Sequence, residues 1–269
     1  MGKKLCLRFL KISLLIALSF TLEGQQLEET NSISLKQPPS SYSIDFQGNL
    51  YVGFDDGRLS KYDAHGRFLE NFSLSNNSSI TLIDVQNNLR AFLFYFDIQQ
   101  VTILDRFSSV PKNYPLSDFS LEISMMACPS PDGDFWIIEN NPQRLKKINP
   151  LRKATVLEAQ ISIGNTIRRM QAYQNILVIG DESGLHLFDS FGGIVQTIPI
   201  ENLIDFHIAG GQLYAFTANQ ILEINPFKGV VNATIDQPKE SKMLLKSRNG
   251  FVSVLNKKLT FYESASSER

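Results

Sequence analysis

This chain has few of the residues that build disulfides, metal centres and catalytic sites. Its 269 residues include two cysteines, three histidines and one tryptophan. Cys6 lies in an N-terminal segment that we expect to be removed, so Cys128 has no partner for an intramolecular disulfide, and we interpret it as a small buried apolar residue. The isolated histidines, His65, His186 and His207, do not form a zinc-binding motif.

The sequence also lacks the common catalytic motifs and any sustained helical period. No nucleophile elbow, phosphate-binding loop or dinucleotide fingerprint occurs. The absence of helical patterns between strand patterns argues against a doubly wound α/β fold. Asp132-Gly-Asp134 and Asp55-Asp-Gly57 resemble the start of calcium loops, but neither continues into the spaced oxygen ligands of such a loop. We predict that both are hairpin turns.

The N-terminus has the pattern of an export signal. Lys3, Lys4, Arg8 and Lys11 precede an uncharged, mostly apolar stretch at residues 12–22. This stretch is shorter than the roughly 20 residues that a membrane-spanning helix needs. We expect residues 1–24 to be a cleaved signal peptide that exports the protein to the periplasm, the outer envelope or the medium. The alternative is an uncleaved N-terminal anchor.

The charge of the remaining chain excludes some classes of partner. Residues 1–24 carry four of the 26 Lys and Arg residues and one of the 27 acids, which leaves 22 bases, 26 acids and a net charge of −4. No basic patch stands out, which argues against nucleic acid or an anionic membrane as the partner. We expect no membrane span after cleavage of the signal.

A short phrase recurs six times: an apolar strand, a polar turn, and a second strand that ends in an acid or an amide. The closing residues are Asp63, Asp105, Asn149, Asp189, Asn225 and Glu263, which lie 42, 44, 40, 36 and 38 residues apart. A repeat of about 40–45 residues with several short strands is typical of a β-propeller blade. Seven blades would need roughly 280 residues and five would leave one phrase unexplained, so the sequence predicts six.

The predicted fold is all-β, with four antiparallel strands in each blade. The second strand of each blade is a near-continuous apolar run, such as residues 50–54, as expected for a strand buried on both faces. The last repeat has only three strands, and we expect residues 31–35 to supply the fourth and close the ring. One domain then covers residues 25–263, followed by a polar tail at 264–269. The stretch at 108–117, with Pro111 and Pro115, is expected to be a surface loop.

The six closing acids and amides have two interpretations. A ring of carboxylates and amides could hold cations. Alternatively, each side chain accepts hydrogen bonds from backbone N–H groups of the turn that follows, as Asp and Asn commonly do. Turn residues follow several of them, including Gly66, Pro150, Gly192 and Pro226. We therefore favour turn formation over metal binding.

Candidate binding residues lie on the predicted inner strands, because a propeller's tunnel is a natural site for a ligand. The polar residues on these strands are Asp45, Asp84, Arg168, Arg169, Asp205, His207 and Lys246. Their mixed charge could receive a small polar ligand or a peptide end. The alternative is a hydrated structural channel in which these groups satisfy one another. A slip of one residue reverses which side chains face inward, so the sequence leaves both interpretations open.

Several phrases resemble known propeller families. Asp132-Gly-Asp-Phe-Trp-Ile137 and Gly48-Asn-Leu-Tyr-Val52 are similar to blade motifs of NHL-type, PQQ-type and bacterial sensor propellers. The closing Tyr62-Asp63 with Gly66 adds to the resemblance, which covers about residues 31–263, although blades 2 and 6 lack the closing glycine. The resemblance implies a six-bladed propeller, and the short basic signal with the disulfide-free domain suggests an exported bacterial protein. PQQ enzymes are expected to show a regular tryptophan in each blade, so the single Trp136 argues against that cofactor, and we predict none.

Two classes of function fit these observations. The favoured one is a non-catalytic, monomeric module that binds a protein, peptide or glycan in the cell envelope, and it predicts an exposed aromatic or apolar patch at one end of the ring. The alternative is a hydrolase or lyase resembling the lactonase-like propellers, with Ca or Zn on the tunnel axis. That enzyme would need several ligands at one point, and Asp45, Asp84 and Asp205 are the candidates. Blade motifs specify the fold rather than the function.

Overall fold

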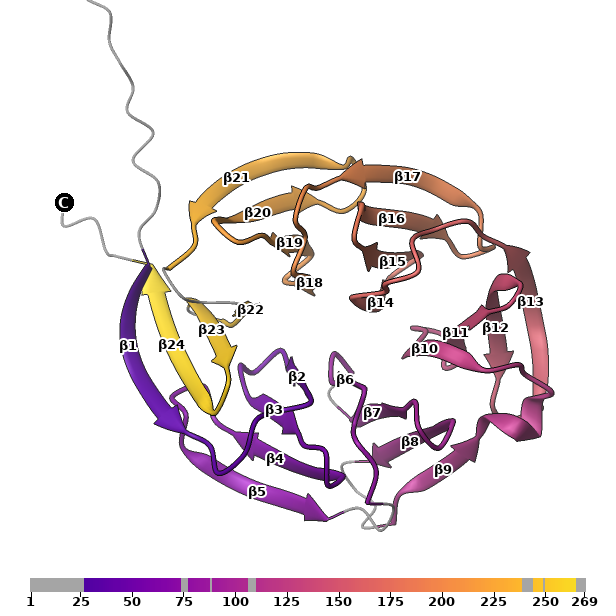
Figure 1. Cartoon of the computed structure of the whole chain (residues 1–269), viewed down its shortest axis with the longest axis horizontal. Coiled ribbons are helices and arrows are strands. Elements are labelled where there is room, and N and C mark those ends of the chain that lie inside the picture. The colour runs from indigo at the N-terminus through magenta and orange to yellow at the C-terminus, as the bar shows by residue number, and fades with distance from the viewer. Residues whose placement is uncertain are drawn as a thin grey trace, which may run out of the picture.

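The computed structural model describes residues 27–73, 77–87, 89–105, 110–238, 244–248 and 250–264, and its strands form six four-stranded antiparallel sheets around a central axis (Figure 1). This confirms the six-bladed β-propeller. The only helix among the described residues is the 3-10 helix η1 (Leu116–Phe119). None of the helical segments described could cross a bilayer, because none is long and apolar enough. The predicted signal peptide and residues 265–269 lie outside the described residues.

Each blade runs from an inner strand at the tunnel to an outer strand at the rim. Blade 1 consists, from the inside, of β2 (Ser41–Ile44), β3 (Leu50–Gly53), β4 (Arg58–Tyr62) and β5 (Phe68–Ser73). Blade 2 consists of β6 (Leu82–Asp84), β7 (Arg90–Tyr95), β8 (Gln100–Asp105) and β9 (Lys112–Pro115). Blade 3 consists of β10 (Ser124–Pro129), β11 (Phe135–Asn140), β12 (Gln143–Asn149) and β13 (Ala154–Gln160). Blade 4 consists of β14 (Arg169–Tyr173), β15 (Ile176–Asp181), β16 (Gly184–Asp189) and β17 (Ile194–Pro199). Blade 5 consists of β18 (Asp205–Ala209), β19 (Gln212–Phe216), β20 (Gln220–Asn225) and β21 (Val230–Asp236).

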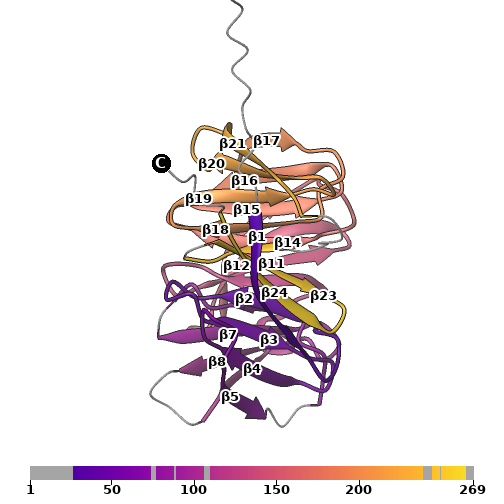
Figure 2. The same cartoon turned by 90° about the vertical axis from the view of Figure 1, so that its left-hand side faces the viewer.

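Blade 6 contains both ends of the domain. Its sheet consists of β22 (Leu244–Lys246), β23 (Gly250–Leu255), β24 (Lys258–Ser264) and, on the outside, β1 (Leu27–Ser34). β1 pairs antiparallel with β24 from Leu27↔Ser264 to Ser34↔Lys258. Figure 2 shows the ring from the side, with β1 facing the viewer. The predicted closure of the ring is therefore confirmed, with a strand that starts four residues earlier than residue 31.

The hydrophobic core lies between neighbouring blades. The second strands are almost fully buried; Leu177, Val178 and Ile179 of β15, for example, are 0% exposed. Side chains on the two faces of such a strand pack against the two adjacent blades, so a strand in this position must be apolar on both faces. This burial on both faces explains why the second strands are near-continuous apolar runs in the sequence. Cys128 is buried and unpaired in this core, as predicted.

The closing acids and amides form turns. Asp63 Oδ1 accepts hydrogen bonds from the backbone N–H groups of His65 and Arg67, both at 2.9 Å. Asp189, Asn149 and Asn225 accept in the same way from the turns that follow them. Gly66 has φ +82° and lies where a Cβ would come within 2.7 Å of a ring atom of Phe261, so both its backbone and its surroundings require glycine. The turn-forming interpretation is confirmed for these four positions.

One prediction was wrong in the second blade. Residues 108–117 were expected to be a loop, but residues 112–115 form β9, the outer strand of blade 2, and η1 follows directly. The strand is short and exposed, and it ends at Pro115, which has no N–H to donate. Proline is tolerated in a strand at the edge of a sheet, so the two prolines of this stretch do not exclude an outer strand.

The antiparallel order defines the two faces of the ring. In every blade the turn between the first and second strands emerges on one face, which we call the hairpin face. In blades 1 to 5 the turn between the third and fourth strands emerges on the same face. The links between blades and the turns between second and third strands emerge on the opposite face, the connection face. The inner strands all start at the connection face and end at the hairpin face.

Candidate functional site

A cavity lies at each end of the tunnel. The cavity at the hairpin face has a volume of about 440 Å³ and is lined by the ends of the inner strands and the turns that follow them, including Asp45, Gln86, His207 and Lys246. The cavity at the connection face, of about 460 Å³, is lined by the starts of the inner strands, including Arg168. Both volumes suit a small ligand or a few residues of a peptide.

Three polar side chains in the lining of the connection-face cavity bind one another across the tunnel. Arg169 Nε and Nη2 donate to Asp205 Oδ1 and Oδ2, each at 2.8 Å, and Tyr42 Oη donates to Asp205 Oδ2 at 3.0 Å. The Arg169 guanidinium also stacks over the Tyr42 ring, 5.4 Å from its centroid. Burial opposes the charge of Arg169, but the Asp205 carboxylate outweighs it and raises the pKa of the guanidinium. These residues come from blades 1, 4 and 5, so they connect the neighbouring blades 4 and 5 to blade 1, which is adjacent to neither.

Asp84 is the least compensated carboxyl group in the tunnel. Its side chain is buried, and the hydrogen bond found for it comes from the backbone N–H of Gln86, 3.0 Å from Oδ1. Burial raises the pKa of Asp84 to about 6, although the Gln86 N–H and the Arg169 charge both lower it. The carboxyl therefore titrates near neutral pH, and above that pH the folded protein holds a poorly solvated negative charge.

We expect Asp84→Asn to stabilise the protein at alkaline pH. The pKa of Asp84 in the folded state lies above the value of about 3.9 in an unfolded chain, so its contribution to the free energy of unfolding is present at low pH and is lost as pH rises through about 6. The substitution should raise the free energy of unfolding by about 2–3 kcal/mol at pH 8 and change it little at pH 4. Urea unfolding at both pH values measures this. Exposed Asp97→Asn is the control, and an equal effect of Asp84→Asn at both pH values would contradict the assignment.

His207 is the one histidine at the tunnel. The residue is 1% exposed and lines the cavity at the hairpin face, and neither ring nitrogen has a hydrogen-bond partner among the described residues. Burial and, to a lesser extent, the nearby Arg169 charge lower the pKa of His207 to about 3, while the Asp205 carboxylate opposes this shift. The imidazole is therefore neutral at physiological pH, with one free N–H donor and one free acceptor nitrogen.

Gln86 closes part of the same cavity. Its Nε2 donates to the carbonyl oxygen of Ile208 at 2.7 Å, which joins blade 2 to blade 5 on the opposite side of the ring. Lys246 Nζ, also in the lining, donates to the carbonyl oxygens of Ser247 and Gly250 and lies 5.0 Å from the centroid of the Phe251 ring. Burial lowers the pKa of Lys246.

Two of the seven candidate residues lie outside the inner strands to which they were assigned. Asp45 follows β2 and belongs to the turn, where its carboxylate accepts from the N–H groups of Gln47 and Asn49 and from the Asn49 amide. Arg168 precedes β14 and is exposed at the connection face. The boundaries shift by one residue because strand ends in a propeller are fixed by the turns, which hydrophobic patterns do not locate.

The three candidate metal ligands are not gathered into a metal site. Among the described residues, no group of three or more His, Cys, Asp or Glu side chains could hold a metal ion. Asp45 is bound by its own turn and Asp205 by Arg169. Asp132-Gly-Asp134 and Asp55-Asp-Gly57 form hairpin turns, with the Asp134 N–H donating to Asp132 and the Arg58 N–H to Asp56.

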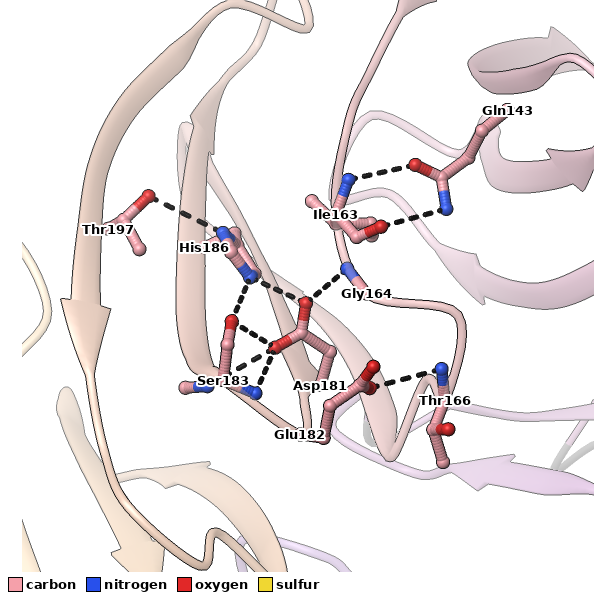
Figure 3. A network of polar contacts seen from close by, with 10 residues as sticks. Gln143, Ile163, Gly164, Thr166, Asp181, Glu182, Ser183, His186 and Thr197 are labelled. Atoms are coloured by element: carbon pink, nitrogen blue, oxygen red, sulfur yellow. Dashed lines mark hydrogen bonds and ion pairs between the residues drawn. The ribbon is translucent and has the colours of Figure 1, made fainter.

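A histidine and a serine meet an aspartate in blade 4, but the geometry is that of a structural network (Figure 3). Asp181 Oδ2 lies 2.7 Å from His186 Nε2, and Asp181 Oδ1 accepts from the Ser183 hydroxyl at 2.7 Å. Ser183 and Asp181 both face Nε2, whereas a catalytic triad needs the base to hold its two partners on different nitrogens. Asp181 also accepts from the Gly164 N–H at 2.6 Å, so the network fastens the link between blades 3 and 4.

Large apolar side chains are exposed on the hairpin face. Phe46 is 60% exposed, Leu151 88%, Phe191 80% and Phe227 50%, and each lies in a hairpin-face turn of a different blade. The Phe227 ring contacts that of Tyr173, which lines the hairpin-face cavity, with centroids 6.3 Å apart. On the connection face, exposed large apolar side chains among the described residues include Phe96 and Ile98 of blade 2 and Ile123 of the link that follows it. The cavity with His207 thus has the aromatic residues Phe46 and Tyr173 in its lining, and Phe227 contacts Tyr173 beside it.

Sequence patterns did not single out two of the residues that shape the tunnel, Tyr42 and Gln86. Tyr42 lies on β2, and Gln86 lies in the turn that follows β6. The partner of Tyr42 is 163 residues away and that of Gln86 is 122 residues away. Asp181, the centre of the blade 4 network, lies at the end of β15, away from the tunnel strands, and was not singled out either. A prediction of six blades implies that blades 2 and 5 face each other, and this was the only available signal for the Gln86 contact.

Comparison with known proteins confirms the fold. No family model and no curated protein matches the sequence. Among solved structures, the Cps50 (Swd1) β-propeller domain of Myceliophteria thermophila is similar with a TM-score of 0.62 and 10% identity, over 89% of this chain and 100% of that one. The Pan2 WD40 domain of Neurospora crassa is similar with a TM-score of 0.63 and 9% identity, over 91% of this chain and 97% of that one. At such low identities the likeness establishes a β-propeller fold.

Proposed function

We propose that this protein is a non-catalytic binding module that docks a protein or peptide on its hairpin face. The observation that carries the proposal is the set of exposed side chains in turns of four different blades, Phe46, Leu151, Phe191 and Phe227. Surface aromatic residues that surround a concave site are typical of binding interfaces, in which they supply most of the affinity. The rigid ring below them holds these turns in fixed positions.

We propose further that the protein acts as a monomer in the cell envelope of a bacterium. The basic residues Lys3, Lys4, Arg8 and Lys11 and the apolar stretch that follows them support export. The similarity of its blade motifs to NHL-type and sensor propellers supports a bacterial origin. A glycan is the second class of ligand for the same face, since exposed aromatic rings also stack on sugars.

Substitution of the aromatic turns should abolish partner binding. We expect Phe46→Ser/Phe191→Ser/Phe227→Ser to reduce the capture of its ligand from envelope extract by more than about tenfold, because each buried aromatic anchor of an interface contributes on the order of 2 kcal/mol. Quantitative mass spectrometry of captured protein and glycan provides the measurement.

The matched control is Phe96→Ser/Ile98→Ser/Ile123→Ser, which removes the same number of exposed apolar side chains from the connection face. This control should capture the ligand as well as the unmodified protein does. If the control loses the ligand and the hairpin-face variant retains it, the assignment of the binding face is wrong. If the two variants bind equally well, the aromatic turns have no role in binding.

A further inference from the structure

The hairpin-face cavity contains a buried polar group with nothing to bind. His207 is 1% exposed, and both ring nitrogens lack a partner among the described residues. More than nine-tenths of buried polar groups in native proteins have a hydrogen-bond partner, and leaving one unpaired costs about 1–3 kcal/mol. Other polar side chains of the tunnel have hydrogen-bond partners: Arg169, Asp205 and Tyr42 bind one another, and Asp84 accepts from the Gln86 N–H. The unpaired ring therefore points to a ligand group at the floor of this cavity.

The charges around the cavity indicate the sign of that ligand. Its lining includes two cations, Lys246 and Arg248, and one carboxylate, Asp45. Both oxygens of Asp45 already accept hydrogen bonds from its own turn. The lining thus carries one net positive charge, together with a neutral imidazole that can donate an N–H. An anion with an acceptor oxygen suits this arrangement, and a cation does not.

The walls indicate what the anion is attached to. Ile44, Phe46, Tyr173, Ile208 and Tyr214 line the same cavity, so most of its side walls are aliphatic or aromatic. A volume of about 440 Å³ holds a few heavy groups in addition to the anion. The lining contains no run of free backbone N–H groups at a helix end of the kind that holds a phosphate.

We propose that the hairpin-face cavity binds a carboxylate attached to an apolar or aromatic group, with the carboxylate on His207 and the rim cations and the apolar group against the aromatic wall. The C-terminus of a peptide and a free aromatic acid share this chemistry. The inference rests on the proposed binding function, and it names the chemical group that the hairpin face recognises at its centre.

The direct test is NMR of the protein labelled with ¹⁵N at histidine, because His207 is one of only three histidines. Addition of N-acetylphenylalaninate should shift the ring nitrogens of His207 and leave those of His65 and His186 unchanged. N-acetylphenylalaninamide, which lacks the charge, should bind at least about tenfold more weakly. Equal affinity for the acid and the amide, or no shift at His207, would overturn the proposal.

Two variants separate binding from folding. His207→Leu should weaken binding of the acid by about tenfold or more, while its Tm stays the same or rises by about 2–4 °C, because an unpaired buried group has been removed. A large fall in Tm would mean that the ring has a structural partner, and it would contradict the proposal. Arg248→Ala on the exposed rim should weaken binding about two- to fivefold, and Arg168→Ala at the connection face should leave it unchanged.

A pentapeptide distinguishes the two sources of the carboxylate. If acetyl-Ala-Ala-Ala-Leu-Phe with a free C-terminus binds at least about tenfold more tightly than N-acetylphenylalaninate, the ligand is a peptide C-terminus. If the pentapeptide and N-acetylphenylalaninate bind with equal affinity, the ligand is a free acid. Both results support a carboxylate site. If neither acid binds while the variant of the aromatic turns still loses its partner, the carboxylate inference fails and the docking function stands.

Discussion

Deletion of residues 27–35 is expected to prevent the chain from forming a stable monomeric ring. β1 supplies the outer strand of blade 6, and its pairing with β24 holds the first and last blades together. The Asn31 side-chain amide also donates to the His65 carbonyl oxygen of blade 1 at 2.8 Å. The Leu35 backbone N–H donates to the Lys257 carbonyl oxygen at 2.6 Å. With about 1 kcal/mol for each hydrogen bond, the loss approaches the 5–15 kcal/mol that stabilises a typical domain.

The deletion should also cause self-association, because β24 would become an exposed edge strand. Gel filtration and thermal unfolding measure both effects. A circular permutant is the matched control: it begins at Gln37 and carries residues 27–35 after Ser264, joined by a two-residue Asn-Gly turn. Ser264 pairs with Leu27, so a tight hairpin can connect them. The permutant should unfold near the temperature of the unmodified protein. A deletion variant that remains monomeric with an unchanged Tm would show that β1 is dispensable.

Arg169→Leu should be the most destabilising single substitution in the tunnel. It removes two hydrogen bonds of 2.8 Å and leaves the Asp205 carboxylate buried without its counter-charge. Breaking one half of a buried ion pair typically costs about 3–5 kcal/mol. For a domain of this size the loss corresponds to a fall in Tm of roughly 6–20 °C. Differential scanning calorimetry and urea unfolding measure it.

Two controls show whether the cost arises from the stranded carboxylate. Arg168→Leu removes the same charge from the adjacent, exposed position and should have an effect below about 1 kcal/mol. Arg169→Leu/Asp205→Asn removes both charges and keeps an acceptor for the Tyr42 hydroxyl, so it should recover much of the lost stability. If the double variant is as unstable as Arg169→Leu, the loss comes from packing rather than from the carboxylate.

The sequence predicted the blades because each blade repeats a pattern that is local in the chain. The second strand is buried on both faces, and the third ends in an acceptor that organises the next turn, as Asp63 and Asp189 do. Both requirements act within ten residues, so they leave a regular trace in the sequence. β9 has no such sequence pattern, because a short exposed strand that ends in proline needs neither an apolar face nor a full ladder of hydrogen bonds.

The site was predictable only as a set of residue types. Five of the seven candidates, Asp84, Arg169, Asp205, His207 and Lys246, lie on inner strands as expected, and whether they bind a ligand stays a prediction. Their partners could not be predicted, because contacts across the tunnel depend on the angle between blades and on side-chain length. The same uncertainty affected His186, which was read as isolated, although the turn residue Asp181 lies only five positions away.

The closure of the ring by β1 also sets the order in which the protein can be completed. β1 is synthesised first and β24 last; Glu29 and Lys258, whose side chains lie 3.4 Å apart, are separated by 229 positions. The entropy lost on joining such distant segments grows slowly with their separation, but the contact cannot form before β24 has been translated. The first strand of every growing chain therefore stays unpaired, and the ring stays open, until β24 has been made.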